Sequence, residues 1–290
     1  MAQGQSYYVP HEARWPLVGS IALTLMAVGF INFLHGASIG PFVLLVGAAL
    51  MVTMMFGWFR SVIIESESGK YDAQVDRSFR WGMGWFIFSE VMFFAAFFGA
   101  LYYARLHSVP WLAGEGNNAM THALLWPEFE ATWPLLTLPA SEGFDLAKGI
   151  VPAWGLPALN TMILLTSGVT ITIAHWGLLK ARRSQLILGL VATVALGFLF
   201  LGIQISEYAH AWQDLNLTLG SGIYGSTFYM LTGFHGAHVT IGAIILTVIL
   251  FRAMAGHFSH ENHFAFEAAA WYWHFVDVVW LGLFVFVYWL

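Results

Sequence analysis

The chain has 290 residues, of which 59% are hydrophobic and 9% charged, whereas about a quarter of the residues in an ordinary soluble domain are charged. This small number of charges could not cover the surface of a water-soluble globule. We therefore expect the chain to lie in a lipid bilayer. The charges, 11 Lys+Arg and 16 Asp+Glu, offer no basic stripe for a nucleic acid, and the absence of cysteine excludes disulfides, thiolate metal sites and iron–sulfur clusters.

The N-terminal part of the chain predicts two membrane spans behind a polar segment. Residues 1–14 lack the basic start, short apolar core and cleavage site of a secretory signal, so we expect them to remain in the mature protein. Residues 15–59 contain no charged side chain and would form a helix of about 68 Å, roughly twice the bilayer core. They therefore predict two helices joined by the Gly- and Pro-containing turn 35–41.

The rest of the chain holds further stretches that each fit one span. They contain no charged residue apart from Glu90 in the first and Asp277 in the last, and they cover residues 81–104, 150–179, 184–206, about 225–251 and 268–290. The prediction is an all-α membrane protein with seven transmembrane helices. We divide it into residues 1–64 with the first two helices, a cytoplasmic loop 65–80, and residues 81–290 with the other five.

The positive charges predict the orientation, because cytoplasmic loops of membrane proteins carry an excess of Lys and Arg. With seven spans, nine fall on the side of the N-terminus: Arg14, Arg60, Lys70, Arg77, Arg80, Lys180, Arg182, Arg183 and Arg252. The other side carries Arg105 and Lys148. We therefore expect a cytoplasmic N-terminus and a periplasmic C-terminus.

The connection between the third and fourth spans, at about 105–156, is expected on the external side. It is rich in Pro, Gly, Trp and acidic residues, and it is long for a connection inside a compact protein. The sequence leaves open whether it forms a packed external lobe or a binding surface, and docking of another subunit there is our hypothesis.

Glu90 lies about 15 Å along its helix from Arg80, which is the depth of the bilayer midplane. A carboxylate at that depth is costly, so we expect it to be protonated or hydrogen-bonded. It could carry protons, or it could be a structural carboxylic acid or a lipid contact. We favour the structural alternative, because its neighbours in sequence, such as Phe88 and Phe93, offer no polar chain for a proton relay.

Several other polar residues are expected within the spans. His235 and His238 share one helical face, and His274 and Asp277 repeat their spacing in the last span. A metal oxidase site is one reading, but the chain lacks the Glu-x-x-His pairs of carboxylate-bridged sites, so we expect hydrogen-bonded neutral imidazoles and no metal ligands. We expect Asp277 to accept N–H bonds from neighbouring indoles or imidazoles.

A cationic cluster precedes the last span. It contains Arg252, His257, His260 and His263. These residues fit either a solvated loop at the level of the lipid headgroups or a site for a lipid phosphate, and the sequence leaves both readings open.

Four stretches of sequence are similar to those of a known family. They are SEVMFF at 89–94, QISEY at 204–208, YGSTF at 224–228 with TGFHGAHV at 232–239, and FEAAAWYWHFVDVVWL at 266–281. On these motifs the chain resembles subunit III of the haem-copper cytochrome c oxidases, and the similarity runs over all seven spans.

The resemblance implies a subunit without redox cofactors of its own, in which a lipid-filled cleft separates a two-helix part from a five-helix part. Its partners would be oxidase subunits I and II and a small subunit IV, which would carry haem a, haem a3, CuA and CuB between them. The implied role in an aa3-type oxidase of a bacterial inner membrane is to stabilise the catalytic subunit, support proton uptake and bind phospholipids.

The resemblance also implies residue roles. Glu90 matches the intramembrane carboxylate of the family, Arg252 and His257 match positions that contact lipid headgroups, and Glu65 matches an acidic position near the cleft. Glu207 and Glu267 lie within the matching motifs, and we expect them to be structural polar groups, as are His235, His238 and His274. Where the family has Gly-x-His-Thr, this chain has Gly-Lys-Tyr-Asp at 69–72.

Three alternatives remain open. The chain could be the equivalent component of a quinol oxidase or nitric oxide reductase, although such relatives commonly lack the first two helices. It could be a proton-conducting channel centred on Glu90. A membrane metal oxidase using His235, His238 and His274 is the third.

Overall fold

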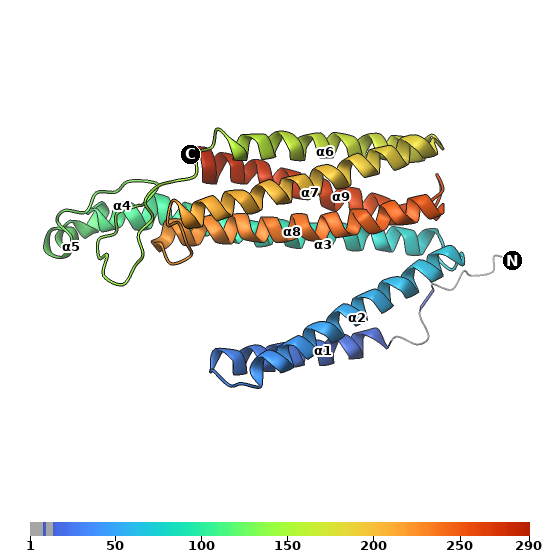
Figure 1. The fold of residues 1–290 in the computed structure, drawn as a ribbon, viewed down its shortest axis with the longest axis horizontal. Coiled ribbons are helices and arrows are strands. Elements are labelled where there is room, and N and C mark those ends of the chain that lie inside the picture. Colours follow the sequence, from blue (N-terminus) through green and yellow to red (C-terminus); the bar gives the residue numbers. More distant parts are fainter. Residues whose placement is uncertain (1–7, 10–13) are drawn as a thin grey trace. The chain divides into compact units, whose positions relative to one another are not determined.

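The computed structural model describes residues 8–9 and 14–290 (Figure 1). The polar segment expected to remain at the N-terminus falls largely outside these residues. Within the described part all regular secondary structure is helical, and seven helices are long and apolar enough to cross a membrane. The structure thus confirms the all-α fold with seven spans that the charge pattern predicts.

The seven spans are α1 (Trp15–Leu34), α2 (Gly40–Glu67), α3 (Ala73–Tyr103), α6 (Leu156–Leu179), α7 (Arg183–Gln213), α8 (Gly222–Ala255) and α9 (Phe264–Leu283), the last continued by the π-helical turn η3 (Phe284–Trp289). Short helical segments, η1 (Ala104–Ser108), α4 (Val109–Leu112), η2 (Gly116–Asn118) and α5 (Ala119–Leu125), follow α3.

Several helices extend beyond their uncharged stretches, and α2 and α3 are two examples. The α2 helix continues from 59 to Glu67, and α3 begins at Ala73 rather than at 81. Charged side chains mark the end of the apolar region without ending the helix, since they can form helical ion pairs such as Arg80 Nε to Asp76 Oδ2 at 2.8 Å. The start of α3 is stabilised by Asp72, whose Oδ1 accepts the backbone N–H of Val75 at 2.8 Å.

The chain divides into two compact units, Met1–Trp81 and Gly82–Leu290, which we describe separately. In the first, α1 and α2 form a hairpin whose backbones approach closely at glycines. A Cβ atom on Gly29 would overlap the backbone of Leu44, and one on Gly47 would lie 2.7 Å from the backbone nitrogen of Met26. Such small residues let membrane helices pack without an aqueous driving force.

In the second unit, α9 packs with α6, α7 and α8, and its two buried tryptophans fill the centre. The ring of Trp273 lies between two glycines, where a Cβ on Gly197 would come within 2.8 Å and one on Gly242 within 2.9 Å of it. The Trp273 indole N–H donates to Ser167 Oγ at 2.8 Å, and that of Trp280 donates to Thr161 Oγ1 at 2.9 Å. These bonds fix the register of α9 on α6.

The long connection between α3 and α6 packs against the end of the second unit where the C-terminus lies (Figure 1). Phe129, Leu135 and Val151 from this connection are buried in the core. The backbone N–H of Lys148 donates to the carbonyl of Leu215 at 2.7 Å, in the loop before α8. The sequence left open whether this connection forms a packed lobe or a binding surface. In the structure it is packed against the second unit.

Candidate functional site

Glu90 on α3 and His238 on α8 form a hydrogen-bonded pair across two helices. Glu90 Oε2 lies 2.9 Å from His238 Nε2, and His238 Nδ1 lies 2.7 Å from the carbonyl of Phe234. A carbonyl can only accept, so Nδ1 carries a hydrogen, and the contact between Nε2 and the carboxyl group requires one proton between them. The sequence predicts that Glu90 is protonated or hydrogen-bonded, but it does not single out His238 as the partner.

Aromatic rings surround the pair. Phe94 lies edge-on to the His238 imidazole with ring centroids 5.0 Å apart, and Tyr272 stacks at 6.4 Å with an interplanar angle of 20°. The side chains of His238 and Glu90 are 14% and 22% exposed. A single shared proton in aromatic surroundings suits a pair that holds α3 to α8.

His235 has different surroundings from His238, although the two lie on one helical face. It is buried, its Nε2 lies 3.2 Å from the carbonyl of Val276, and its ring packs on Trp280 at 5.1 Å. His274 is exposed and lies on another part of the bundle surface, beside Thr172. The structure does not bring these three histidines together among the described residues, so the metal oxidase alternative loses its set of ligands.

Asp277 is buried and lies against α6. Its Oδ2 is 3.5 Å from His274 Nδ1, and a Cβ on Gly168 would overlap its carboxyl group. Of the indoles and imidazoles expected as donors to Asp277, the imidazole of His274 lies beside it, whereas Trp273 and Trp280 donate to hydroxyl groups on α6. Asp277, His274 and Thr172 line a surface groove between α6 and α9 whose other lining residues are apolar.

Glu207 near the end of α7 belongs to a buried network with the C-terminal turn. Its Oε1 accepts the hydroxyl of Tyr288 at 2.6 Å and the Nε2 amide of Gln204 at 3.0 Å. The Gln204 side-chain oxygen is in turn 3.5 Å from the amide of Asn160 on α6. This network ties α6, α7 and η3 together, which is a structural arrangement for a buried carboxyl group.

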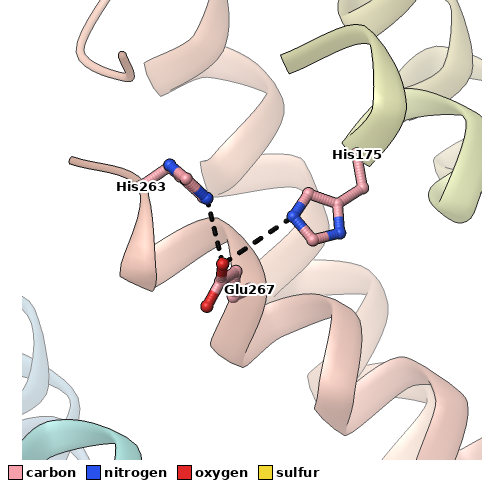
Figure 2. A group of neighbouring side chains, drawn as sticks. All are labelled: His175, His263 and Glu267. Carbon is pink, nitrogen blue, oxygen red and sulfur yellow. Dashed lines mark ion pairs between the residues drawn. The ribbon is translucent and has the colours of Figure 1, made fainter. Parts of the chain in front are cut away.

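A further cluster joins α6 to the start of α9. Figure 2 shows the imidazoles of His175 and His263 directed toward the carboxyl group of Glu267. The Glu267 Oε1 atom lies 2.9 Å from His263 Nε2 and 3.8 Å from His175 Nε2. From the sequence we expected Glu267 to be a structural group and His263 to belong to the cationic loop, and His175 was not predicted as their neighbour. The signal available was that His175 lies four residues before the end of its helix, at the level where α9 begins.

The loop between α8 and α9 separates the four cations that the sequence groups together. The guanidinium of Arg252 lies over the ring of Phe258, with 4.7 Å from Cζ to the ring centroid. His257 and His260 are exposed, whereas His263 is buried and directed inward. The four side chains therefore do not face one space, and contact of Arg252 and His257 with lipid headgroups stays a prediction.

Glu65 in the first unit accepts a hydrogen bond from Tyr71, the residue that replaces the histidine of the Gly-x-His-Thr pattern. The distance from the Tyr71 hydroxyl to Glu65 Oε2 is 2.8 Å, and the ring of Tyr71 packs edge-on against Phe79 at 5.1 Å. Burial raises the pKa of Tyr71 above the ordinary tyrosine value, and the hydrogen bond to Glu65 raises it further. Tyr71 is therefore a stable donor that orients the Glu65 carboxyl group.

These observations define a helical membrane protein that crosses the bilayer seven times and carries histidine–carboxylate pairs between its helices. The comparison with protein families specifies it further. The family model described as "Cytochrome c oxidase subunit III" matches residues 5–127 and 118–290. The chain belongs to the cytochrome c oxidase subunit III family.

Curated relatives agree with this assignment. The chain is similar to proteins named "Cytochrome c oxidase subunit 3" from Gadus morhua (39% identical over 288 residues), Pongo abelii (41% over 290) and Danio rerio (40% over 288). In each case the similarity covers 99% of this chain and 98% of the relative. Subunit III of cytochrome c oxidase does not itself carry the redox centres, which agrees with the role implied by the sequence motifs.

Proposed function

We propose that this chain is the non-redox third subunit of an aa3-type cytochrome c oxidase. The complex oxidises cytochrome c, reduces oxygen to water and moves protons outward across the membrane. The main support for this proposal is that the chain is about 40% identical to proteins named "Cytochrome c oxidase subunit 3", over nearly the whole length of both chains.

The partners in this proposal are oxidase subunits I and II and a small subunit IV. Haem a, haem a3, CuA and CuB belong to subunits I and II, and the present chain packs on the catalytic subunit. The apolar surface of the second unit supports such packing or a contact with lipid, because many of its large side chains, including Met162 and Leu188, are exposed.

The chain's own contribution is to stabilise the catalytic subunit and to support proton uptake. The Glu90–His238 pair supports the first role, because one shared proton and a surrounding layer of aromatic rings hold α3 against α8 without a net buried charge. We keep Glu90 as a structural group and lipid contact rather than as a link in a proton relay.

Phospholipid binding is the second contribution. Arg252 and His257 supply the cationic groups at the end of α8, where a lipid phosphate would be attracted. Glu65, oriented by Tyr71, supplies an acceptor in the first unit for the amine of a zwitterionic or aminophospholipid headgroup.

For the location we propose the inner membrane of a bacterium, with a cytoplasmic N-terminus and a periplasmic C-terminus. The excess of Lys and Arg at the N-terminal side supports this orientation. Reporter fusions to the ends of single spans test it, and they should be active in the periplasm after residue 34 and inactive there after residue 67.

The experiment for the supporting role compares the oxidase with and without this chain. We expect the complex that lacks it to start turnover at a similar rate, to take up protons more slowly and to lose activity during sustained turnover, and we expect added chain to restore these properties. Unchanged proton uptake and unchanged lifetime in the depleted complex would contradict the proposal.

A channel centred on Glu90 is the competing function from another class. It predicts proton conduction by the purified chain in proteoliposomes. The surroundings of the pair argue against it, because the rings of Phe93, Phe94, Tyr272 and Phe275 lie around His238.

A further inference from the structure

Three side chains from two helices converge where α6 ends and α9 begins. His263 immediately precedes α9, Glu267 lies in its first turn, and His175 lies near the end of α6. The atoms they offer, one from each residue, all lie within 4.8 Å of one another. His175 is 88 positions or more from the other two residues in the chain, and together the three present nitrogen and oxygen atoms to one small space (Figure 2).

The hydrogen-bond pattern shows which atoms of His263 face this space. His263 Nδ1 lies 3.0 Å from the backbone carbonyl of Ser259. Because the carbonyl can only accept, Nδ1 carries the hydrogen, and in the neutral imidazole Nε2 presents its lone pair. The Nε2 atom lies 2.9 Å from the Oε1 atom of Glu267.

His175 adds a second nitrogen to the same oxygen atom. Its Nε2 is 3.8 Å from Glu267 Oε1, is buried, and has no hydrogen-bond partner in the described structure. The Nε2 atom of His263 is also buried without a partner in hydrogen-bond geometry. The lone pair of His263 Nε2 and a carboxyl oxygen of Glu267 therefore face one another in a buried place, which is costly unless a positive charge lies between them.

The donor set and its spacing fit a transition-metal cation. Two imidazole nitrogens and one carboxylate oxygen form a ligand set that proteins use for zinc, with a water in the fourth position. Bonds of about 2.0–2.2 Å in a tetrahedral arrangement place neighbouring ligand atoms about 3.3 Å apart. The observed separations of 2.9 and 3.8 Å lie on either side of that value.

The groups around the cluster also resemble the surroundings of a metal site. The bond from His263 Nδ1 to the Ser259 carbonyl is the kind of contact that fixes the tautomer and orientation of a ligating histidine. The fully buried ring of Phe266 packs on His175 with centroids 5.4 Å apart, which limits the access of water from that side.

We propose that His175, His263 and Glu267 bind a divalent cation of the zinc type, which joins the end of α6 to the start of α9. These three residues do not belong to the Glu90–His238 pair or to the His274–Asp277 pair. The sequence predicted no metal in this chain, on the basis of His235, His238 and His274, and the present proposal departs from that prediction at a different set of residues.

The test measures zinc in the intact purified complex. The complex is incubated with zinc sulfate, freed of excess metal, and analysed for zinc by mass spectrometry, and its affinity is measured by competition with a chromophoric chelator. Any zinc bound by partner subunits would be present in the wild-type and in every variant, so it does not affect the difference in zinc content between them. The variants are His175→Asn and Glu267→Gln, and the control is His260→Asn, which alters an exposed histidine of the same loop.

We expect one zinc per complex to be lost in both ligand variants, with a fall in affinity of at least about tenfold, and to be kept in the control. Equal zinc binding by the wild-type and both variants would overturn the proposal, since the metal would then be adventitious. A wild-type complex that takes up no additional zinc would overturn it too, and would leave a proton as the positive charge of the cluster.

A second measurement does not depend on the assembly of the variants. X-ray absorption at the zinc edge of the loaded wild-type complex, compared with the complex before loading, should show an added site with two imidazoles and one carboxylate oxygen at about 2.0–2.2 Å. An added site without imidazole scattering would contradict the assignment.

Discussion

Glu90 and His238 are 148 residues apart in the chain, yet their side chains lie 2.9 Å apart and hold α3 to α8. The second nitrogen of His238 is committed to the carbonyl of Phe234, so the pair has one proton to share. This arrangement explains how a carboxyl group can occupy the middle of a membrane span without a charged partner.

Replacing Glu90 by Gln should leave assembly and much of the oxidase turnover intact. A glutamine amide is nearly isosteric with a protonated carboxyl group, and its N–H can donate to His238 Nε2. The change in stability should stay within about 1 kcal/mol, measured by thermal unfolding of the purified complex. Complete loss of turnover in a fully assembled Glu90→Gln complex would mean that Glu90 does more than support the fold.

Replacing either partner by Leu should have a larger effect than the Gln variant. Glu90→Leu or His238→Leu leaves one polar group in apolar surroundings without its partner, which costs about 1–3 kcal/mol. The double variant should cost less than the sum of the single variants, because neither polar group then remains. Additive effects in this double-mutant cycle would indicate that the two side chains do not interact.

Gly197 should not accept even a methyl group. Gly197→Ala should destabilise the protein by about 1–3 kcal/mol, because the new Cβ would come within 2.8 Å of the Trp273 ring, which the hydrogen bond to Ser167 holds in place. Gly202→Ala on the same helix is the control, since nothing lies within 4 Å of its Cβ position. Thermal unfolding compares the two, and equal midpoints would contradict the packing described for Trp273.

Tyr71→Phe should remove the donor to Glu65 and destabilise the protein by about 1 kcal/mol. The pKa of Tyr71 is raised in the folded state, so its contribution is fully present below the unfolded value of 10.0 and is lost only as the pH rises through the raised value. The difference between Tyr71→Phe and wild-type should therefore be constant between about pH 6 and pH 9. Tyr102→Phe, at an exposed tyrosine, is the control.

Arg252→Gln should weaken binding of an anionic phospholipid about fivefold, which corresponds to about 1 kcal/mol for one cationic side chain near the membrane surface. Native mass spectrometry of the complex in mild detergent counts the lipids that remain bound. Arg105→Gln, on the opposite side of the predicted topology, should not change this count. An equal loss of lipid in both variants would indicate a general effect of charge rather than a site.

The sequence predicts the spans because the bilayer imposes a simple rule on charge. Residues 15–59 had to form two helices, and α1 and α2 meet at the predicted turn. The ends of the helices were predicted less well, because α2 and α3 continue past their apolar stretches as charged helices, and the apolar pattern does not mark where those charged segments end.

The partners of the buried polar groups could not be predicted in the same way. Helical spacing places His235 and His238 on one face, but it does not say which helix each of them meets. The pairing of His238 with Glu90, and of His175 with Glu267, depends on how helices far apart in the chain pack. Trp273 and Trp280 illustrate the same limit, since their donors reach hydroxyl groups on α6 and not the nearby Asp277.

The central claim, that this chain is the third subunit of a cytochrome c oxidase, is tested most directly by purifying the tagged chain from its own membrane in mild detergent. We expect oxidase subunits I and II, haem a and copper to accompany it, and the preparation to oxidise reduced cytochrome c with consumption of oxygen. A chain that purifies without haem or copper, or with a complex that oxidises quinol or reduces nitric oxide but not cytochrome c, would contradict the claim.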